Sequence, residues 1–174
     1  MAMHFFFSKR TLRHFCTHGI FWVGVSWGVI ACSENGASQE LPRDLQEQLR
    51  VECLDFTNEK RASENLSPLL RHQAQESCAD QQASSDQAQS APHGGFKDCE
   101  ELAQNTCPGW PIDSTDASSI QVVQKCLQSM WDEGPGEDFS QHGHYLNMSS
   151  TRYTGLACGF SVLDGRLWVN MNFY

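Results

Sequence analysis

The chain has 174 residues, which is the length of one ordinary domain. It carries 21 acidic and 12 basic residues, so its formal net charge is −9. Binding to nucleic acid phosphates or to anionic lipid needs a local excess of lysine and arginine, and the composition therefore argues against both kinds of partner.

Residues 1–31 have the pattern of a secretory signal. They contain three basic residues and no acidic one, and the apolar run 20–31 follows the basic part. This run is shorter than the roughly 20 apolar residues that a membrane-spanning helix needs. A buried core helix is the alternative interpretation. Removal of residues 1–31 would take away three positive charges and change the net charge from −9 to −12.

The cysteine at the end of the apolar run, Cys32, directly follows the apolar residues 29–31. This order resembles a bacterial lipobox, in which the cysteine is lipidated and becomes the mature N-terminus. We therefore expect a lipid anchor on Cys32 that holds the protein at a bacterial outer membrane or cell surface. Ordinary secretion is the alternative. Residues 32–44 would form a tether, and residues 45–174 the folded domain.

The first predicted helix covers residues 42–64. Its apolar residues Leu45, Leu49, Cys53 and Phe56 recur at spacings of 4, 4 and 3, which is the stripe of a helix with one buried face. The pattern therefore predicts that this helix packs against a core along that stripe.

Two further helices are predicted. One begins at Ser67-Pro68, with serine as N-cap and proline in the first turn, and fades into the polar run 81–90, whose alanines keep helical spacing. The other covers about 118–133 and stops at Gly134-Pro135-Gly136. Glycines and prolines predict irregular structure in residues 91–117, which lie between the two helices.

The C-terminal residues predict a β-hairpin with the arms Leu156–Leu163 and Arg166–Phe173. Asp164-Gly165 between them is a two-residue turn of the kind that needs positive φ angles. Helices that are separate in sequence from antiparallel strands indicate an α+β domain built in layers.

Six cysteines remain in the predicted mature domain once Cys16 in the signal and Cys32 are set aside. An even set in an exported domain predicts disulfide bonds. The candidates are Cys53, Cys78, Cys99, Cys107, Cys126 and Cys158. Six cysteines allow about 15 sets of three pairs. We favour a local Cys99–Cys107 bridge, and zinc bound by thiolates is the alternative.

The second half of the chain carries a series of short motifs. In order they are Trp131-Asp132-Glu133, Gly143-His144-Tyr145, Cys158-Gly159-Phe160 and an apolar C-terminal strand. This series resembles the signature of the CAP superfamily, which comprises cysteine-rich secretory proteins, antigen 5 and pathogenesis-related proteins. Its pattern reads Gly-Glu-Asn, Trp-x-x-Glu, Gly-His-Tyr and Gly-Cys-Gly. The resemblance spans residues 45–174 and implies a three-layer α-β-α sandwich with an antiparallel sheet, braced by disulfides.

The resemblance further implies a cleft lined by two histidines and two glutamates. His144 matches the histidine of Gly-His-Tyr, and Glu133 matches the glutamate of Trp-x-x-Glu in a motif that is one residue shorter here. We align Glu101 with the glutamate of Gly-Glu-Asn, although neither neighbour matches. His93 corresponds to the histidine that precedes this segment.

Three kinds of chemistry suit His93, Glu101, Glu133 and His144. The two histidines could ligate a divalent metal such as Zn²⁺, each oriented by a glutamate, with water completing the coordination. The same residues could form a buried polar network that pins a helix to the sheet. They could also hydrolyse a substrate, with Glu133 or Glu101 as base. His142 would add a third ligand if it faced the same side as His144; exposure in a loop is the alternative.

The sequence therefore predicts an exported, lipid-anchored CAP-domain protein that binds rather than catalyses. Its cleft would take a divalent metal, a small apolar ligand or a protein partner. A secreted hydrolase that uses the same four residues is the alternative.

Overall fold

The structure is a computed structural model that describes residues 39–174 except 114 and 116. The predicted signal, the lipidation candidate Cys32 and the first part of the predicted tether lie outside the described residues. The remainder of the tether, residues 39–44, lies against the domain. The Gln39 amide donates to the carbonyl of Val162 at 3.0 Å, and Leu41 is buried in the core.

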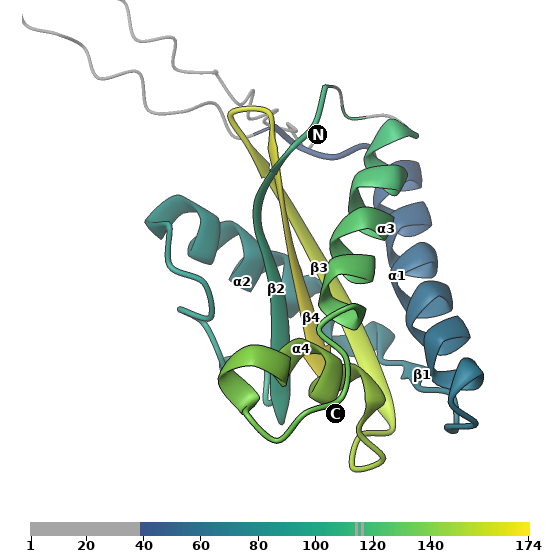
Figure 1. The fold of residues 1–174 in the computed structure, drawn as a ribbon. Helices are drawn as coiled ribbons and strands as arrows, with labels where there is room; N and C mark the ends of the chain where they lie inside the picture. Colours follow the sequence, from purple (N-terminus) through teal and green to yellow (C-terminus); the bar gives the residue numbers. More distant parts are fainter. Residues whose placement is uncertain (1–38, 114, 116) are drawn as a thin grey trace, which may run out of the picture. The chain divides into compact units, whose positions relative to one another are not determined.

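Within the described residues, the chain forms four α-helices, one 3-10 helix and a four-stranded sheet (Figure 1). The elements are α1 (Arg43–Ser63), β1 (Leu70–Arg71), the 3-10 helix η1 (Gln73–Gln75), α2 (Glu76–Gln89), β2 (Ala103–Pro111), α3 (Ser118–Trp131), α4 (Phe139–Ser149), β3 (Gly155–Leu163) and β4 (Arg166–Phe173). None of the described helices combines the length and apolarity that crossing a bilayer requires.

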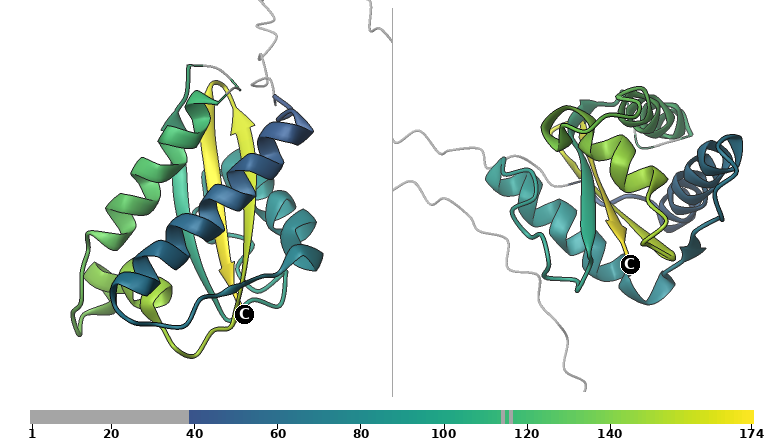
Figure 2. Two further views of the ribbon diagram at one scale, coloured as in Figure 1. Left: turned by 90° about the vertical axis from the view of Figure 1, so that its right-hand side faces the viewer. Right: turned by 60° about the horizontal axis from the view of Figure 1, so that its bottom comes forward.

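The sheet has the strand order β1-β3-β4-β2. β2, β4 and β3 pair antiparallel, and the two-residue strand β1 pairs parallel with β3. α2 covers one face, and α1, α3 and α4 cover the other (Figure 2). The predicted α+β class and α-β-α layers are confirmed, with one short parallel pair added to the antiparallel sheet.

The sheet face toward α1 and α3 is apolar. Successive side chains of a strand point to opposite sides, so every second residue of β3 and β4 faces these helices. The residues are Leu156, Cys158, Phe160, Val162, Leu167, Val169, Met171 and Phe173, and all are buried. Burial of each such large apolar side chain contributes roughly 1.5–3 kcal/mol. This face therefore supplies the main apolar core.

The sheet face toward α2 combines small and polar residues. In β3 the residues on this side are Gly155, Ala157, Gly159 and Ser161, which let the helix come close. A Cβ atom on Gly159 would lie 2.1 Å from the backbone carbon of Ala79 in α2. A side chain at this position would therefore push α2 away from the sheet.

The predicted boundaries agree with the structure for α1, α3 and the hairpin. The turn residues Asp164 and Gly165 have φ angles of 52° and 65°, as the two-residue turn requires. The predicted start of the second helix at Ser67-Pro68 is wrong, because α2 begins at Glu76. The Leu70 amide donates to the carbonyl of Thr154, just before β3, and the His72 amide donates to Leu156 in β3. Pairing with a distant strand thus overrides the local helix signal.

Two elements of the structure differ from the sequence predictions. β2 lies inside residues 91–117 despite Pro108 and Pro111, because it is an edge strand with a register shift between Cys107 and Trp110. Proline is tolerated at sheet edges and bulges. α4 is a fourth helix that the sequence analysis did not predict, and the carboxylate of Asp138 caps it by accepting from the Ser140 amide at 2.9 Å.

All six cysteines of the domain form disulfides. The pairs are Cys53–Cys158, Cys78–Cys99 and Cys107–Cys126. The predicted Cys99–Cys107 bridge is wrong, because Cys107 faces α3 from β2 whereas Cys99 lies beside α2, on the other side of the sheet. The same pairings leave none of these six thiolates for a zinc site.

Candidate functional site

Three of the four candidate residues line one cleft. His93 comes from the loop after α2, Glu133 from the segment after α3, and His144 from α4. The cleft has a volume of about 500 Å³. The fourth candidate, Glu101, is buried and does not line it.

Glu133 holds His144 and the backbone of α4 at the same time. Its Oε1 accepts from His144 Nδ1 at 2.5 Å, and its Oε2 accepts from the His144 amide at 2.9 Å. The Tyr145 amide also approaches Oε2, at 3.4 Å. Because Nδ1 donates to a carboxylate, Nε2 is the ring nitrogen of neutral His144 that is left for a ligand.

Gln104 has the corresponding role for His93. The Gln104 Oε1 atom accepts from His93 Nδ1 at 2.9 Å. The amide nitrogen of Gln104 donates to Asn172 and Gln82, at 3.0 and 3.3 Å, and these two bonds fix which end of the amide meets the histidine. His93 therefore also keeps Nε2 for a ligand. The sequence pointed to Glu101 for this role and missed Gln104.

Glu101 fixes the loop that carries His93. Its Oε1 accepts from the Lys97 amide at 2.7 Å and from the Gln82 side chain at 2.8 Å, and its Oε2 accepts from the Cys99 amide at 3.1 Å. A carboxylate that receives several N–H bonds can be buried without a cation. Glu101 thus acts on the cleft through the backbone of residues 93–100.

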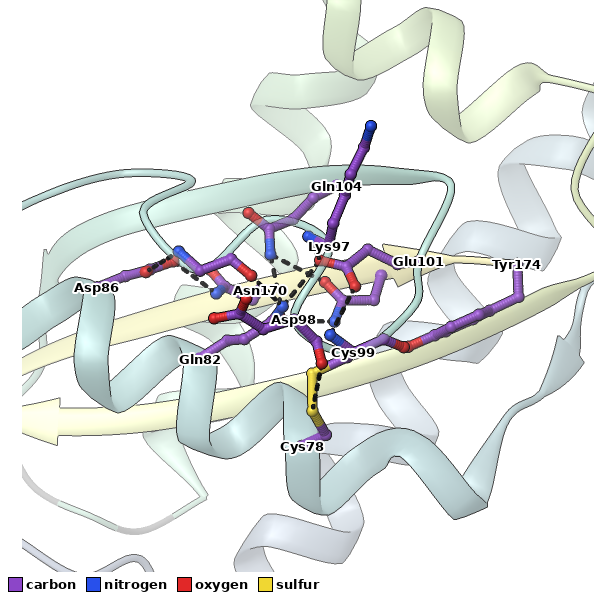
Figure 3. Close-up of a disulfide and its surroundings, with 12 residues drawn as sticks. Cys78, Gln82, Asp86, Lys97, Asp98, Cys99, Glu101, Gln104, Asn170 and Tyr174 are labelled. Carbon is purple, nitrogen blue, oxygen red and sulfur yellow. Dashed lines mark hydrogen bonds between the residues drawn. A yellow bond between two sulfur atoms is a disulfide. The ribbon is translucent and has the colours of Figure 1, made fainter.

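The same loop is held from α2 (Figure 3). The Asp86 carboxylate accepts from the Gly95 amide at 2.8 Å, the Gln82 side chain donates to the Gly95 carbonyl at 2.6 Å, and the Cys78–Cys99 disulfide closes the far end. These contacts stabilise an unfavourable backbone, because His93, Lys97 and Glu100 all have positive φ. The loop is therefore preorganised by its surroundings.

α4 is anchored at its far end by a buried arginine. Arg61 from α1 donates to the carbonyls of Met148, Ser150 and Ser67 at 2.7, 2.9 and 2.8 Å. Two of these carbonyls lie at the C-terminal end of α4, where a positive charge is favourable. Burial lowers the pKa of Arg61. The helix that presents His144 is thus held in its middle by Glu133 and at its C-terminal end by Arg61.

Tyr145, the third residue of the Gly-His-Tyr motif, packs away from the cleft. Its ring lies 4.8 Å from that of Trp131, and its hydroxyl donates to Glu64 at 2.6 Å. Burial and the neighbouring Glu64 raise the pKa of Tyr145 to about 12. Tyr145 therefore contributes to the position of α4 and does not line the cleft.

His142 does not join His144. An extended backbone would place both on one side, but residues of an α-helix two apart point in different directions. The Nδ1 atom of His142 instead contacts the carbonyls of Glu133 and Gly134, at 2.7 and 3.0 Å. His142 therefore holds the segment that carries Glu133, and it neither shares a side with His144 nor lies in a loop.

The rim of the cleft consists of residues that the sequence did not single out. Phe96, Leu102 and Phe139 line it, and Arg152 lies at the turn before β3. A large apolar residue next to turn-forming residues was the available signal for Phe96 and Phe139, whereas Leu102 has no such neighbour. That signal is weak, because isolated exposed apolar residues are common on protein surfaces.

The cleft presents two imidazole Nε2 atoms, those of His93 and His144. The Nδ1 atom of each ring is hydrogen-bonded to Gln104 or Glu133, and this bond orients the ring. Two imidazoles fit a weak divalent site in which water or a ligand supplies the remaining coordination. In the described part of the chain, no group of three or more His, Cys, Asp or Glu side chains could hold a metal ion. A tightly bound, all-protein metal centre is therefore not built from these residues.

Comparisons with known proteins concern the family and the fold of the chain. The family model CAP, described as the cysteine-rich secretory protein family, matches residues 54–172. The chain is also similar to the crystal structure of NaASP2 with Zn²⁺, with a TM-score of 0.54, 16% sequence identity, and coverage of 77% of this chain and 83% of that chain. At this identity the similarity concerns the fold alone. The comparison with curated proteins gave no match.

Proposed function

Because the chain belongs to the cysteine-rich secretory protein family, we propose that it is an exported, non-enzymatic binding module. Its cleft would take a small ligand with apolar surface and a divalent metal ion. The observation that carries the proposal is the meeting of His93 and His144 in one apolar-rimmed cleft, each with Nε2 left for a ligand.

The metal part of the proposal depends on these two nitrogens. His93 and His144 would hold the ion, with Gln104 and Glu133 orienting the rings from behind. The ion would supply a Lewis-acidic point for a carbonyl or carboxylate oxygen of the ligand. The crystal structure of NaASP2, a protein of similar fold, was determined with Zn²⁺, which supports this choice of ion.

The positions of both glutamates favour binding over hydrolysis. A general base needs a lone pair aimed at water or substrate. Both oxygens of Glu133 already accept bonds from His144 and its backbone, and Glu101 is buried beneath the loop. A turnover that depends on Glu133, in a broad panel of peptides and esters, would overturn the non-enzymatic assignment.

Export is supported by the three disulfides and by the family, because disulfides persist in oxidising compartments. The lipid anchor on Cys32 remains part of the proposal. Mass spectrometry of the mature protein should show added acyl mass on its N-terminus, and Cys32→Ser should abolish it. Cleavage at another position would contradict the anchor.

The metal site is tested by calorimetric titration of the purified domain with Zn²⁺. We expect His93→Ala and His144→Ala each to weaken binding at least about tenfold, since each removes one of two protein ligands. His72→Ala is the matched control, because His72 does not line the cleft. Equal zinc affinity in the wild type and in the His93→Ala/His144→Ala double variant would disprove the site.

A further inference from the structure

The rim of the cleft gathers apolar side chains that elsewhere would be buried. Five large apolar residues of the described chain are exposed, and three of them line this cleft. Leu102 is 64% exposed, Phe139 61% and Phe96 37%. Exposed apolar residues that cluster around a concavity mark a ligand site, whereas scattered ones carry no such meaning.

The floor of the cleft, in contrast, presents polar atoms. No partner within the described residues occupies Nε2 of His93 or of His144. A plain hydrocarbon chain laid across these nitrogens would remove their water and return no hydrogen bond, which costs roughly 1–3 kcal/mol for each. The preferred ligand therefore combines an apolar group with polar atoms.

Arg152 adds a cation to this surface. It is the one lysine or arginine among the residues that line the cleft, in a chain whose net charge is −9. Its guanidinium lies 5.4 Å from the Tyr153 ring centre and donates to the Tyr153 hydroxyl at 3.1 Å. No carboxylate of the described chain pairs with it. Its remaining N–H donors are thus available to a carboxylate, which matches the planar fork of arginine.

The walls are fixed before any ligand arrives. The loop of residues 93–100, with His93 and Phe96, is held by Asp86, Glu101 and the Cys78–Cys99 disulfide (Figure 3). Glu133 holds the other wall, α4, at His144. A preorganised cleft loses little conformational entropy on binding, so a small ligand can be held there.

We propose that the cleft binds the C-terminal end of a peptide or protein whose last residue is apolar or aromatic. The last side chain packs on Phe96, Leu102 and Phe139, the α-carboxylate pairs with Arg152, and the last peptide groups lie beside the two imidazoles. A volume of about 500 Å³ suits a chain end rather than a folded surface. This inference rests on the proposed function, because it names the ligand of the same cleft.

The test compares two probes that differ only in terminal charge, N-acetyl-glycyl-phenylalanine and its C-terminal amide. Binding is measured by calorimetry on the metal-free domain in the presence of a chelator. We expect the acid to bind about tenfold more tightly than the amide, from one charge-assisted bidentate pair. Arg152→Gln should remove this preference, and Phe139→Ser should weaken both probes. Arg43→Gln, the same charge change outside the cleft, should alter neither.

Several results would overturn the inference and leave the proposed function standing. These are equal affinity for acid and amide, or tighter binding of decanoate with the same dependence on Arg152. A third is a preference for the acid that appears only when zinc replaces the chelator and that persists in Arg152→Gln. Failure of both probes to bind, while zinc still binds through His93 and His144, would have the same meaning. If neither zinc nor any probe binds, the proposed function fails together with the inference.

Discussion

The two faces of the central sheet differ in the polarity of their side chains. The face toward α1 and α3 is apolar, and its disulfides Cys53–Cys158 and Cys107–Cys126 lie in the core. The face toward α2 carries the side chains of Gln104, Thr106, Asn170 and Asn172, and they bond to one another and to α2. The same three strands therefore present a hydrophobic core to one side and a polar network to the other.

The difference teaches how stability and precision are divided in this domain. Apolar packing is strong but not directional, whereas buried hydrogen bonds fix atoms relative to one another when all of them are satisfied. The polar face leads from β4 through Gln82 and Gln104 to His93. We infer that the apolar face holds the domain together and that the polar face sets the geometry of the cleft.

Removal of disulfides from the two faces should have the largest effects. Cys53–Cys158 spans 105 residues and Cys78–Cys99 spans 21. The chain-entropy argument gives about 4.7 kcal/mol for the long loop and about 3 kcal/mol for the short one. We expect urea unfolding of the two double Cys→Ser variants to show this order. Only loss of Cys78–Cys99 should also speed hydrogen exchange in residues 93–100. Faster exchange in these residues after loss of Cys53–Cys158 instead would contradict the division between the two faces.

A matched pair of single changes tests the division directly. Phe173→Ala on the apolar face should lower the free energy of unfolding by about 3–5 kcal/mol. Glu101→Gln on the polar side should lower the free energy of unfolding by about 1–3 kcal/mol. The change replaces one carboxylate oxygen by an NH2 group, which cannot accept from the backbone N–H that it faces. Only Glu101→Gln should lower the exchange protection of the Lys97 and Cys99 amides relative to the rest of the domain. If both changes lowered the protection of these two amides equally, the proposed division between the apolar and the polar face would be wrong.

The close approach of α2 predicts an asymmetry between two glycines of β3. Gly159→Ala should lower the free energy of unfolding by about 3 kcal/mol, because its Cβ would collide with the backbone of Ala79. Gly155→Ala, on the same strand and side, meets nothing nearer than 3.5 Å and should change stability by less than about 1 kcal/mol. Urea unfolding of both variants tests this difference. Similar losses of unfolding free energy in the two variants would mean that α2 can move away from the sheet.

The loss of stability at alkaline pH tests one tyrosine on each side of the sheet. Burial raises the pKa of both Tyr145 and Tyr174 to about 12, from 10.0. The unfolded chain therefore loses these protons first, and the stability they contribute is present below pH 10.0 and lost as pH rises toward 12. Tyr145→Phe and Tyr174→Phe should each flatten the fall in unfolding free energy across this range. An unchanged slope in both would contradict the shifts.

Local patterns in the sequence were sufficient for α1, α3 and the hairpin. Each has a repeat or a turn that is complete within about twenty residues, as in the stripe from Leu45 to Phe56 or the turn at Asp164-Gly165. The resemblance also selected His93, Glu133 and His144, and all three line the cleft. It could not place them in space, because the sequence carries no distance between segments.

The tertiary structure alone decided the contacts between distant segments. Pairing with β3 drew residues 70–72 out of the predicted helix, and the alternation of β2 turned Cys107 toward α3 and away from Cys99. Gln104 reaches His93 from β2, whereas Glu101 precedes the strand and bonds to the loop backbone and Gln82. In each case the stabilising contact forms between two separate segments, so the local sequence of either segment alone does not indicate it. The sequence therefore determined α1, α3, the hairpin and the family, whereas packing determined β2, the start of α2 and which side chains meet.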